Sequence, residues 1–358
     1  MNVNPSAFSA RPAEPGDLEE VAGLLQQVFG VRFCSASLRW KYGGGSGKFI
    51  GSTVLTHQTR IVGFLGQVPL RARVAGRDIL ATQGVDVAIL AEYRRLDSFL
   101  TLIHNCDGNL KEAGVELIYG TANTDSAIPL SSLLGQQTVA AIPLLVRPLG
   151  PGSLPPPQRG LPLLGRLLTA CMDGVACCTT GLPSRHDSLR IGSIPRFDSR
   201  HDSLWGRIRD DYPIMLTRDA AALNWRYVDI PGRVYQRLEI GNPSTGECEG
   251  YVVLGLTQRE NRVRGRICDL VTPAKAPRRL ARALIAAGVG WFRKNGADIA
   301  DVWMLPHTHL RIPLYQQGFF PRRTTLGALQ ASGLTADVAS ILQSADHWFL
   351  AMGDSDTV

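Results

Sequence analysis

Hydrophobic and polar residues follow two different periods along this chain. The segment GDLEEVAGLLQQVF (16–29) has an acidic first turn followed by an apolar face, which predicts an amphipathic helix. The segment RRLARALIAAGVGWFRKNG (278–296) repeats this scheme. The short segments GVDVAI (84–89) and RICDLV (266–271) are typical of strands, and each carries one aspartate among hydrophobic residues. Helices and strands therefore alternate, and we predict a fold of the α/β class, of the α+β type.

The chain contains an internal repeat. The segment LRWKY (38–42) is matched by LNWRY (223–227), and LKEAGVELIYG (110–120) is matched by RKNGADIADVW (293–303). Five landmark pairs recur in the same order, at offsets between 182 and 187 residues: Trp40 and Trp225, Gly63 and Gly250, Asp86 and Asp269, Gly114 and Gly296, and Gly135 and Gly318. A nearly constant offset of this kind indicates two copies of one structural unit, with the two tryptophans expected in the cores.

The repeat divides the chain into two domains and a connection. We place the first copy at residues 1–146 and the second at 211–358. Residues 147–210 begin with RPLGPGSLPPPQRGLP, which predicts a proline- and glycine-rich linker leading into an irregular segment. The sequence SRHDSL occurs there twice, at 184–189 and 199–204. We expect two exposed turns at these copies, and no bound metal.

Composition and charge narrow the function classes. The 358 residues are 44% hydrophobic and 19% charged, which is enough apolar material for two cores. The net charge of +7 suits an anionic partner, but it is spread along the chain without basic blocks, so we expect no DNA binding. The seven cysteines form no CxxC pair, and neither a signal peptide nor a transmembrane segment is visible. These features predict a cytoplasmic protein with reduced cysteines.

The motifs and their order resemble the GNAT N-acyltransferase superfamily, in tandem. The first copy is similar over residues 8–146, and the second over about 211–350, through LNWRY, LYQQGF (314–319) and the closing WFLAMGDSD (348–356). The resemblance implies two tandem GNAT-like domains, each a mixed twisted sheet flanked by helices. It also implies acetyl-CoA or a longer acyl-CoA as the acyl donor, and no metal.

The resemblance places the donor site in the first copy. In the superfamily a central strand separates from its neighbour and holds the pantetheine arm, and the next loop, Arg-x-x-Gly-x-Gly/Ala, holds the pyrophosphate at a helix N-terminus. Here Asp97 stands where a glycine is expected, so we expect it to cap a helix beginning near Ser98 and to weaken coenzyme A binding. The implied donor-binding residues are Val87, Ala88, Ile89, Arg94, Arg95, Leu96, Asp97, Ser98, Phe99 and Asn123.

Catalysis needs a proton acceptor for the amine and a proton donor for the leaving thiolate. The strand carboxylate Asp86 is the candidate base. Many family members use a tyrosine four residues before the GF glycine. That position is Ser131 in the first copy and Leu314 in the second, where Tyr315 follows one place later. His307 and His309 are further candidates to serve a substrate amine, or else solvated loop residues.

The resemblance therefore implies an N-acyltransferase that moves an acyl group from a thioester to the amine of a small molecule. An amino sugar or an amino-acid derivative is the acceptor class that the resemblance suggests. An acyl carrier protein is an alternative donor, since a carrier presents one phosphate and its acidic surface suits a basic chain. Two other functions stay open: a catalytically degenerate module used for binding or scaffolding, and an aminoacyl-tRNA-dependent transferase.

Overall fold

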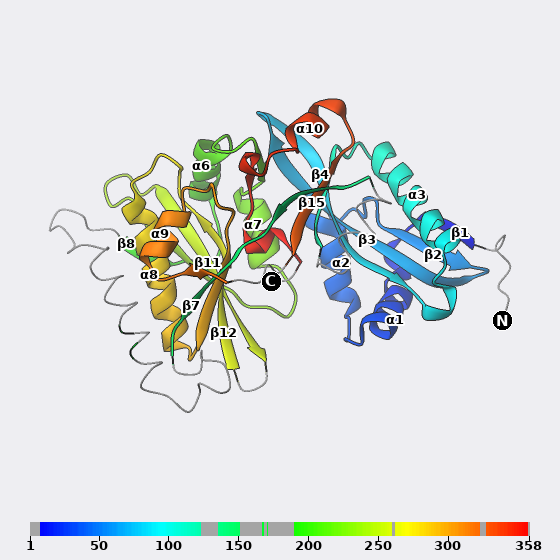
Figure 1. The fold of residues 1–358 in the computed structure, drawn as a ribbon, viewed down its shortest axis with the longest axis horizontal. Helices are drawn as coiled ribbons and strands as arrows, with labels where there is room; N and C mark the ends of the chain where they lie inside the picture. The colour runs from blue at the N-terminus through cyan, green and yellow to red at the C-terminus, as the bar shows by residue number, and fades with distance from the viewer. Residues whose placement is uncertain are drawn as a thin grey trace. The chain divides into compact units, whose positions relative to one another are not determined.

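The computed structural model describes residues 8–122, 135–150, 167, 170, 190–259, 262–322 and 327–356. The chain forms two compact units (Figure 1). Unit 1 comprises Met1–Ala140, Asp229–Arg233 and Leu329–Ser344, and unit 2 comprises Ala141–Val228, Val234–Ala328 and Ala345–Val358. Each unit contains one mixed sheet flanked by helices, so the predicted fold class is confirmed.

Unit 1 is built on a sheet with the strand order β1-β2-β3-β4-β5-β15-β6. Neighbouring strands from β1 to β4 are antiparallel, and β4 and β5 are parallel. The strands are β1 (Phe8–Pro12), β2 (Thr53–His57), β3 (Arg60–Val74), β4 (Arg77–Ile89), β5 (Leu117–Ala122), β6 (Gln137–Ala141) and β15 (Ala328–Gly333). The helices are α1 (Leu18–Phe29), α2 (Ser35–Gly43), α3 (Leu96–Glu112) and α10 (Ala336–Ile341).

Unit 2 repeats this plan with the strand order β8-β10-β11-β12-β13-β7-β14. Its parallel pair is β12 and β13, and the other neighbours are antiparallel. The strands of this sheet are β7 (Leu144–Pro148), β8 (Arg190–Ser193), β10 (Gln236–Gly241), β11 (Cys248–Arg259), β12 (Arg262–Val271), β13 (Ile299–Trp303) and β14 (Phe320–Pro321). Two short segments outside this sheet, β9 (Ile214–Leu216) and β16 (Trp348–Phe349), pair with each other in parallel. The helices are α6 (Ser199–Ile208), α7 (Ala220–Tyr227), α8 (Arg278–Lys294) and α9 (Arg311–Gln316).

Each sheet includes a strand from the other half of the sequence. β15 lies within the second copy of the sequence, yet it pairs between β5 and β6 in the sheet of unit 1. β7 begins within the first copy, at Leu144, yet it lies between β13 and β14 in unit 2. Residues 190–208 form β8 and α6 of unit 2, so the predicted irregular segment does not extend over them. The boundaries at 146 and 211 otherwise remain a prediction.

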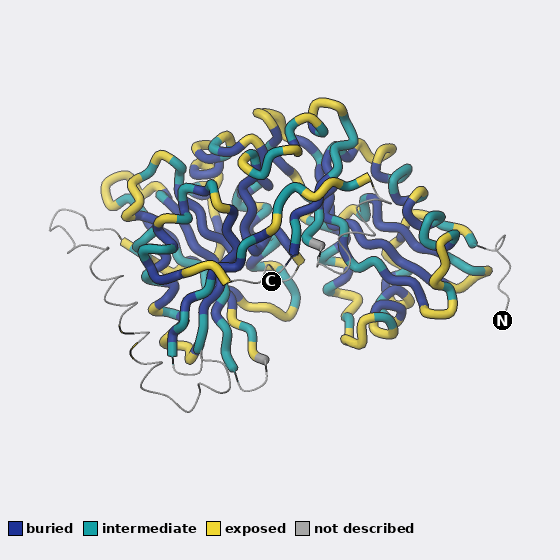
Figure 2. Tube along the Cα trace, in the orientation of Figure 1, coloured by how far each residue is buried: buried dark blue, intermediate teal, exposed yellow. Residues whose placement is uncertain are grey.

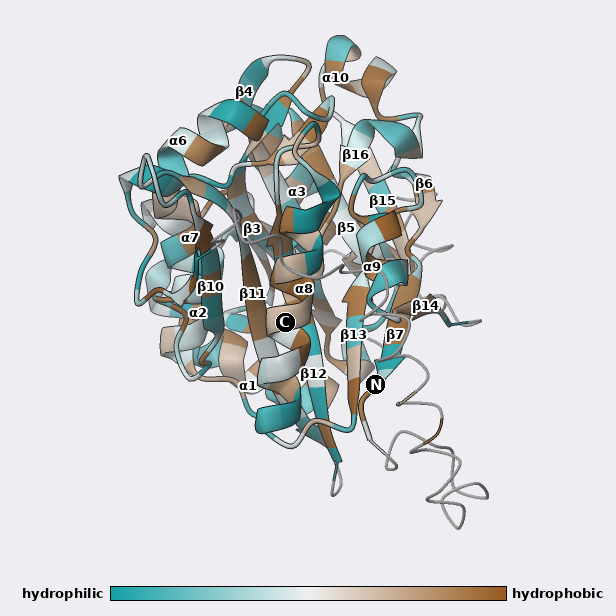
Figure 3. Cartoon of the chain, turned by 90° about the vertical axis from the view of Figure 1, so that its left-hand side faces the viewer, coloured by the Kyte–Doolittle hydropathy of each residue, from teal (hydrophilic) through white to brown (hydrophobic). Residues whose placement is uncertain are grey.

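The sheets have helices on both faces. In unit 1, Tyr42 of α2 contacts Gly66 of β3, while Cys106 of α3 contacts the next residue, Gln67. Successive side chains on a strand point to opposite faces, so α2 and α3 cover opposite faces of this sheet. The helix faces expected from the sequence are buried, at Val21, Leu24 and Leu25 in α1 and at Leu280, Leu284 and Ile285 in α8. The buried segments of both sheets are dark blue in Figure 2, and β11 is largely hydrophobic in Figure 3.

The two motif tryptophans are only half-buried, so they do not form the centre of either core. The tyrosine two residues later is buried instead, with Tyr42 0% and Tyr227 3% exposed. Helical geometry explains the difference, because residues two apart on a helix face different directions. The repeated W-x-Y segment therefore contributes its tyrosine to each core.

Candidate functional site

The parallel strands of unit 1 separate along part of their length. β4 pairs with β5 at Ala81–Gln83 and Leu117–Tyr119, and within the described part of both strands this pairing does not reach the end of β4. The register between β4 and β3 also shifts after Val85, which leaves Asp86 in a β-bulge with φ of 51°. Bulges redirect side chains and are common beside active sites. The expected donor-facing residues Val87, Ala88 and Ile89 lie on this separated stretch.

Asp86 is held by two side chains of α2. Lys41 Nζ and the Tyr42 hydroxyl each lie 2.6 Å from the same oxygen, Oδ2 of Asp86. The Asp86 and Lys41 side chains are 13% and 17% exposed, so solvent reaches the pair. The sequence predicted Asp86 as a catalytic base but missed both partners. The recurrence of a tyrosine at the same place in the two copies was the available signal.

The loop after β4 enters α3 in a different way from the one the sequence predicted. Helix α3 begins at Leu96 with Arg95 as its N-cap, so Asp97 lies inside the first turn and is not the cap. The Asp97 carboxylate accepts the Ser98 N–H at 2.9 Å and pairs with Arg95 Nε at 3.3 Å. The Asp97 carboxylate therefore accepts an N–H of the first turn, but Asp97 is not the N-cap that the sequence predicted, because the helix begins before it.

Other side chains of this loop hold it against β4. Arg94 donates from Nε to the Ile89 carbonyl at 2.9 Å, and Ser98 donates from Oγ to the carbonyls of Tyr93 and Arg95. The Phe99 N–H donates to the Arg95 carbonyl, the first bond of the helical ladder. Because the first N–H groups of a helix have no acceptor inside it, the N–H groups of Leu96 and Asp97 point out of the N-terminus of α3.

Two buried polar side chains lie on β4 where the strands begin to separate. Thr82 and Gln83 occupy the last rungs paired with β5, and they are 0% and 1% exposed. The Thr82 hydroxyl and both polar atoms of the Gln83 amide make no hydrogen bond to the part of the chain that the structure describes. A buried amide without partners is costly, so these two side chains mark an unusually polar stretch of β4.

The remaining candidate residues belong to unit 2 or lie outside the described residues. Ser131 and Asn123 lie outside the described residues. Tyr315 belongs to α9 of unit 2, where its hydroxyl accepts a hydrogen bond from Arg311 Nε at 2.6 Å. His309 is half-buried in unit 2, bonded to the Thr272 carbonyl and the Tyr212 hydroxyl, and desolvation lowers its pKa. Both of its ring nitrogens therefore have protein partners.

The corresponding aspartate of unit 2 lies in a closed environment. Asp269 follows a bulge in β12 and is 2% exposed. Arg218 lies between Asp269 and Asp354, at 3.2 Å and 2.7 Å, and the Tyr251 hydroxyl donates to Asp269 Oδ2 at 3.0 Å. Burial alone lowers the pKa of Arg218, but the two carboxylates outweigh it and hold that pKa well above its ordinary value. Burial raises the pKa of Asp269, against the effect of Arg218.

The chain itself fills the place beside Asp269. β12 pairs with β13 up to Ile267 and Val302, and the short helix η8 (Met352–Asp354) packs against β12. A Cβ atom added at Gly353 would lie 1.8 Å from the Tyr227 hydroxyl and 3.0 Å from the Cys268 carbonyl. Residues 350–355 are all buried. Residues 350–355 therefore cover the end of β12 beside Asp269.

Comparisons with known proteins identify the fold. No family model and no curated protein matches this sequence. A GCN5-related N-acetyltransferase from Anabaena variabilis ATCC 29413 is similar in structure, with a TM-score of 0.62, 13% identity, and coverage of 92% of this chain and 73% of that one. A GCN5-related N-acetyltransferase from Kribbella flavida matches with a TM-score of 0.63, 10% identity, and coverage of 96% and 75%.

A third solved structure is N-myristoyltransferase from Saccharomyces cerevisiae with bound myristoyl-CoA and inhibitors. It matches with a TM-score of 0.60, 13% identity, and coverage of 98% of this chain and 88% of that one. The matches cover both units of this chain. The two sheets of this chain have equivalent strand orders. Among the described residues, no helix is long and apolar enough to cross a membrane. The chain thus has the fold of the GCN5-related N-acetyltransferases, with one mixed sheet in each of its two units.

Proposed function

We propose that this protein is an N-acyltransferase that binds an acyl-CoA in unit 1 and transfers the acyl group to the amine of a small molecule. The observation that carries the proposal is the separation of β4 from β5 beside the N-terminus of α3. In unit 2 the end of β12 beside Asp269 is covered by residues 350–355, which favours unit 1 as the donor site.

The residues of unit 1 are suited to binding an acyl-CoA, except for Asp97. The outward N–H groups of Leu96 and Asp97, the dipole of α3 and the nearby Arg95 would attract the pyrophosphate. Val87, Ala88 and Ile89 would lie along the pantetheine arm. Asp97 opposes this, because its carboxylate already accepts the Ser98 N–H and repels phosphate. We therefore expect coenzyme A to bind more weakly than it would with glycine at this position.

The proposed reaction uses Asp86 as the proton acceptor. The amine nitrogen attacks the thioester carbonyl carbon, the carbon–sulfur bond breaks, and the thiolate leaves with the bonding electron pair. The attacking nitrogen must lose a proton, and a carboxylate positioned by hydrogen bonds is a suitable acceptor. Lys41 and Tyr42 both contact Oδ2 of Asp86, so in the proposed reaction they hold the carboxylate while Oδ1 accepts the proton.

Binding and turnover separate this proposal from its rivals. Calorimetry should be run with coenzyme A, acetyl-CoA and longer acyl-CoAs. The affinity should be highest for the acyl-CoA whose chain length fits the site. A thiol-release assay with a panel of amines should then show acceptor-dependent turnover. Binding without turnover on any amine would favour an acyl carrier protein or aminoacyl-tRNA as the true substrate. If no acyl-CoA binds to the folded protein, the donor site in unit 1 is refuted.

A non-catalytic binding module is the second candidate. The observation in its favour is the first turn of α3, where Asp97 and Ser98 occupy positions and hydrogen bonds that a phosphate would need. In that case the protein should bind neither coenzyme A nor an acyl carrier protein. The variant Asp97→Gly separates the two candidates, because it restores the glycine without touching Asp86.

A further inference from the structure

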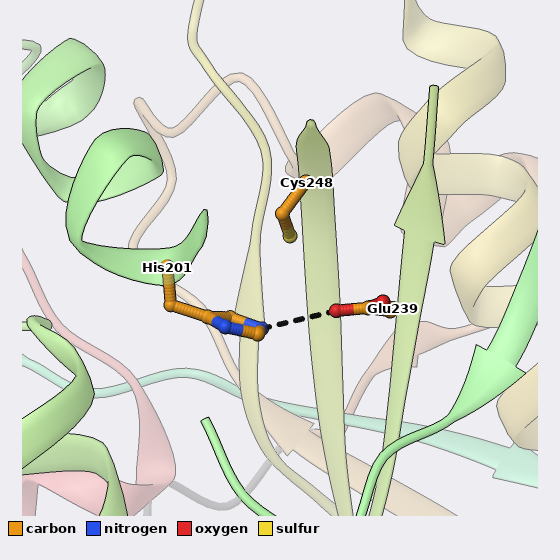
Figure 4. Close-up of side chains that lie close together, drawn as sticks. All are labelled: His201, Glu239 and Cys248. Carbon is orange, nitrogen blue, oxygen red and sulfur yellow. Dashed lines mark ion pairs between the residues drawn. The ribbon is translucent and has the colours of Figure 1, made fainter. Parts of the chain in front are cut away.

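Three potential metal ligands meet inside unit 2, away from the strand separations. His201 comes from α6, Glu239 from β10 and Cys248 from the first position of β11 (Figure 4). His201 and Cys248 are 0% exposed and Glu239 is 8% exposed. One ligand atom of each residue, imidazole nitrogen, carboxylate oxygen or thiol sulfur, lies within 4.8 Å of the other two.

The spacing fits a tetrahedral ion. His201 Nε2 and Glu239 Oε2 are 3.3 Å apart. Two ligands about 2.1 Å from a tetrahedral zinc ion lie roughly 3.4 Å from each other, and a sulfur ligand lies about 3.6 Å from a nitrogen. The Cys248 side chain would need to move by about 1 Å at most to complete this geometry. His201 Nε2 and Glu239 Oε2 form an ion pair, but neither makes a hydrogen bond of normal geometry to the described part of the chain.

The surrounding residues hold the outer atoms of these ligands. Arg200 donates from Nη1 to Glu239 Oε1 at 2.6 Å, which leaves Oε2 for the centre of the cluster. The Asp198 backbone N–H donates to His201 Nδ1 at 3.1 Å, and Asp198 Oδ1 lies 3.3 Å from the same nitrogen. Metal-bound histidines usually donate their second N–H to a carboxylate, which fixes the tautomer. When Nε2 binds an ion, Nδ1 therefore takes up the ring proton and exchanges the Asp198 N–H for the Asp198 carboxylate as its partner.

We propose that His201, Glu239 and Cys248 bind one divalent transition-metal ion of the Zn²⁺ class. A thiolate and an imidazole select such an ion over Mg²⁺ or Ca²⁺, which prefer oxygen ligands. One thiolate and one carboxylate balance the two positive charges, so the complex is neutral, as burial requires. With three protein ligands, a water completes the tetrahedron. The ion joins α6 to β10 and β11, and it reverses the sequence expectation of no metal at the second SRHDSL copy.

The experiment uses the full chain, stripped with a chelator and then titrated with ZnCl₂ or CoCl₂. We expect one Zn²⁺ per chain by elemental analysis and a thiolate-to-cobalt charge-transfer band in the near ultraviolet. Cys248→Ser should remove the band, and His201→Gln should abolish stoichiometric zinc. Asp198→Asn should weaken zinc binding by about 10-fold to 100-fold. Cys268→Ser is the matched control, since Cys268 is buried in the adjacent strand β12 but outside the cluster, and it should keep both signals.

A second arm keeps the test decisive if a ligand variant fails to fold. Cys171, Cys177 and Cys178 are replaced together by serine, which removes the thiols that lie outside the described residues. This triple variant should retain one Zn²⁺ and the cobalt band. A wild-type protein that takes up no zinc after stripping would overturn the proposal, and so would zinc binding lost in the triple variant or unchanged in folded Cys248→Ser. In those cases the cluster is a buried ion pair beside a thiol.

Discussion

The two aspartates at the same place in the repeat lie in opposite environments. Asp86 shares one oxygen between Lys41 and Tyr42, and the Asp86–Lys41 pair is reached by solvent. Asp269 is enclosed with Arg218 and Asp354 behind residues 350–355. The bulge and the tyrosine of the W-x-Y segment recur in both units, so the scaffold is shared. The comparison indicates that one copy leaves its aspartate within reach of solvent, while the other encloses it in a buried cluster of charges.

Removing the cation beside each aspartate should give the largest difference between the two units in the free energy of unfolding. Replacing Arg218 by Met leaves two buried carboxylates without their cation, so we expect unfolding to become easier by about 3–5 kcal/mol. Lys41→Met removes the cation from the solvent-reached pair of unit 1, and we expect a cost of about 1 kcal/mol or less. Urea denaturation followed by circular dichroism measures both. Equal costs for the two variants would contradict the contrast between the units.

Activity should depend on only one of the aspartates. We expect Asp86→Asn to lower kcat/KM for acyl transfer by about 100-fold or more, since an amide cannot accept the amine proton. The thermal midpoint should change little, because the amide can still accept from Tyr42. Asp269→Asn is the matched variant and should change the thermal midpoint more than the activity per folded molecule. Full activity in folded Asp86→Asn would remove Asp86 from the reaction.

Steric substitution tests how tightly residues 350–355 cover the end of β12 in unit 2. Gly353→Ala places a methyl group against the Tyr227 hydroxyl, and we expect a loss of about 1–3 kcal/mol in stability. Gly290→Ala is the control, because the same added atom in α8 meets nothing within 4 Å and alanine favours a helix. Chemical denaturation of both variants gives the comparison. Equal stability of Gly353→Ala and wild type would show that the segment is loosely packed.

The smallest expected effect concerns the first turn of α3. Asp97→Gly should strengthen coenzyme A binding several-fold while lowering stability by about 1 kcal/mol, because the turn loses a favourable charge and gains chain entropy. Asp97→Asn separates charge from bulk, since it removes the repulsion but keeps the side chain. Calorimetry supplies both binding constants and melting supplies the stabilities. Weaker binding in both variants would instead assign Asp97 to the donor site.

Local sequence patterns predicted the elements of this fold well. Periodicity predicts the apolar faces of α1 and α8 and the strands β4 and β12. An element that buries one face has apolar residues at regular intervals along its sequence. The helix-terminating glycines Gly114 and Gly296 both have positive φ, near 75° and 73°, which a glycine adopts without steric cost. The order of these motifs was enough to predict the fold class and the bulge aspartate as a candidate.

Only the tertiary structure shows which distant strands and side chains these elements contact. No local pattern shows that β15 joins the sheet of unit 1 or that β7 joins the sheet of unit 2, because strand pairing depends on contacts between distant segments. For the same reason the sequence missed Lys41 beside Asp86, and Arg218 with Asp354 beside Asp269. His201, Glu239 and Cys248 form no short motif, and the fold of unit 2 brings them within 4.8 Å. Sequence periodicity determines which residues face inward, and the packing of distant segments decides which residues they meet.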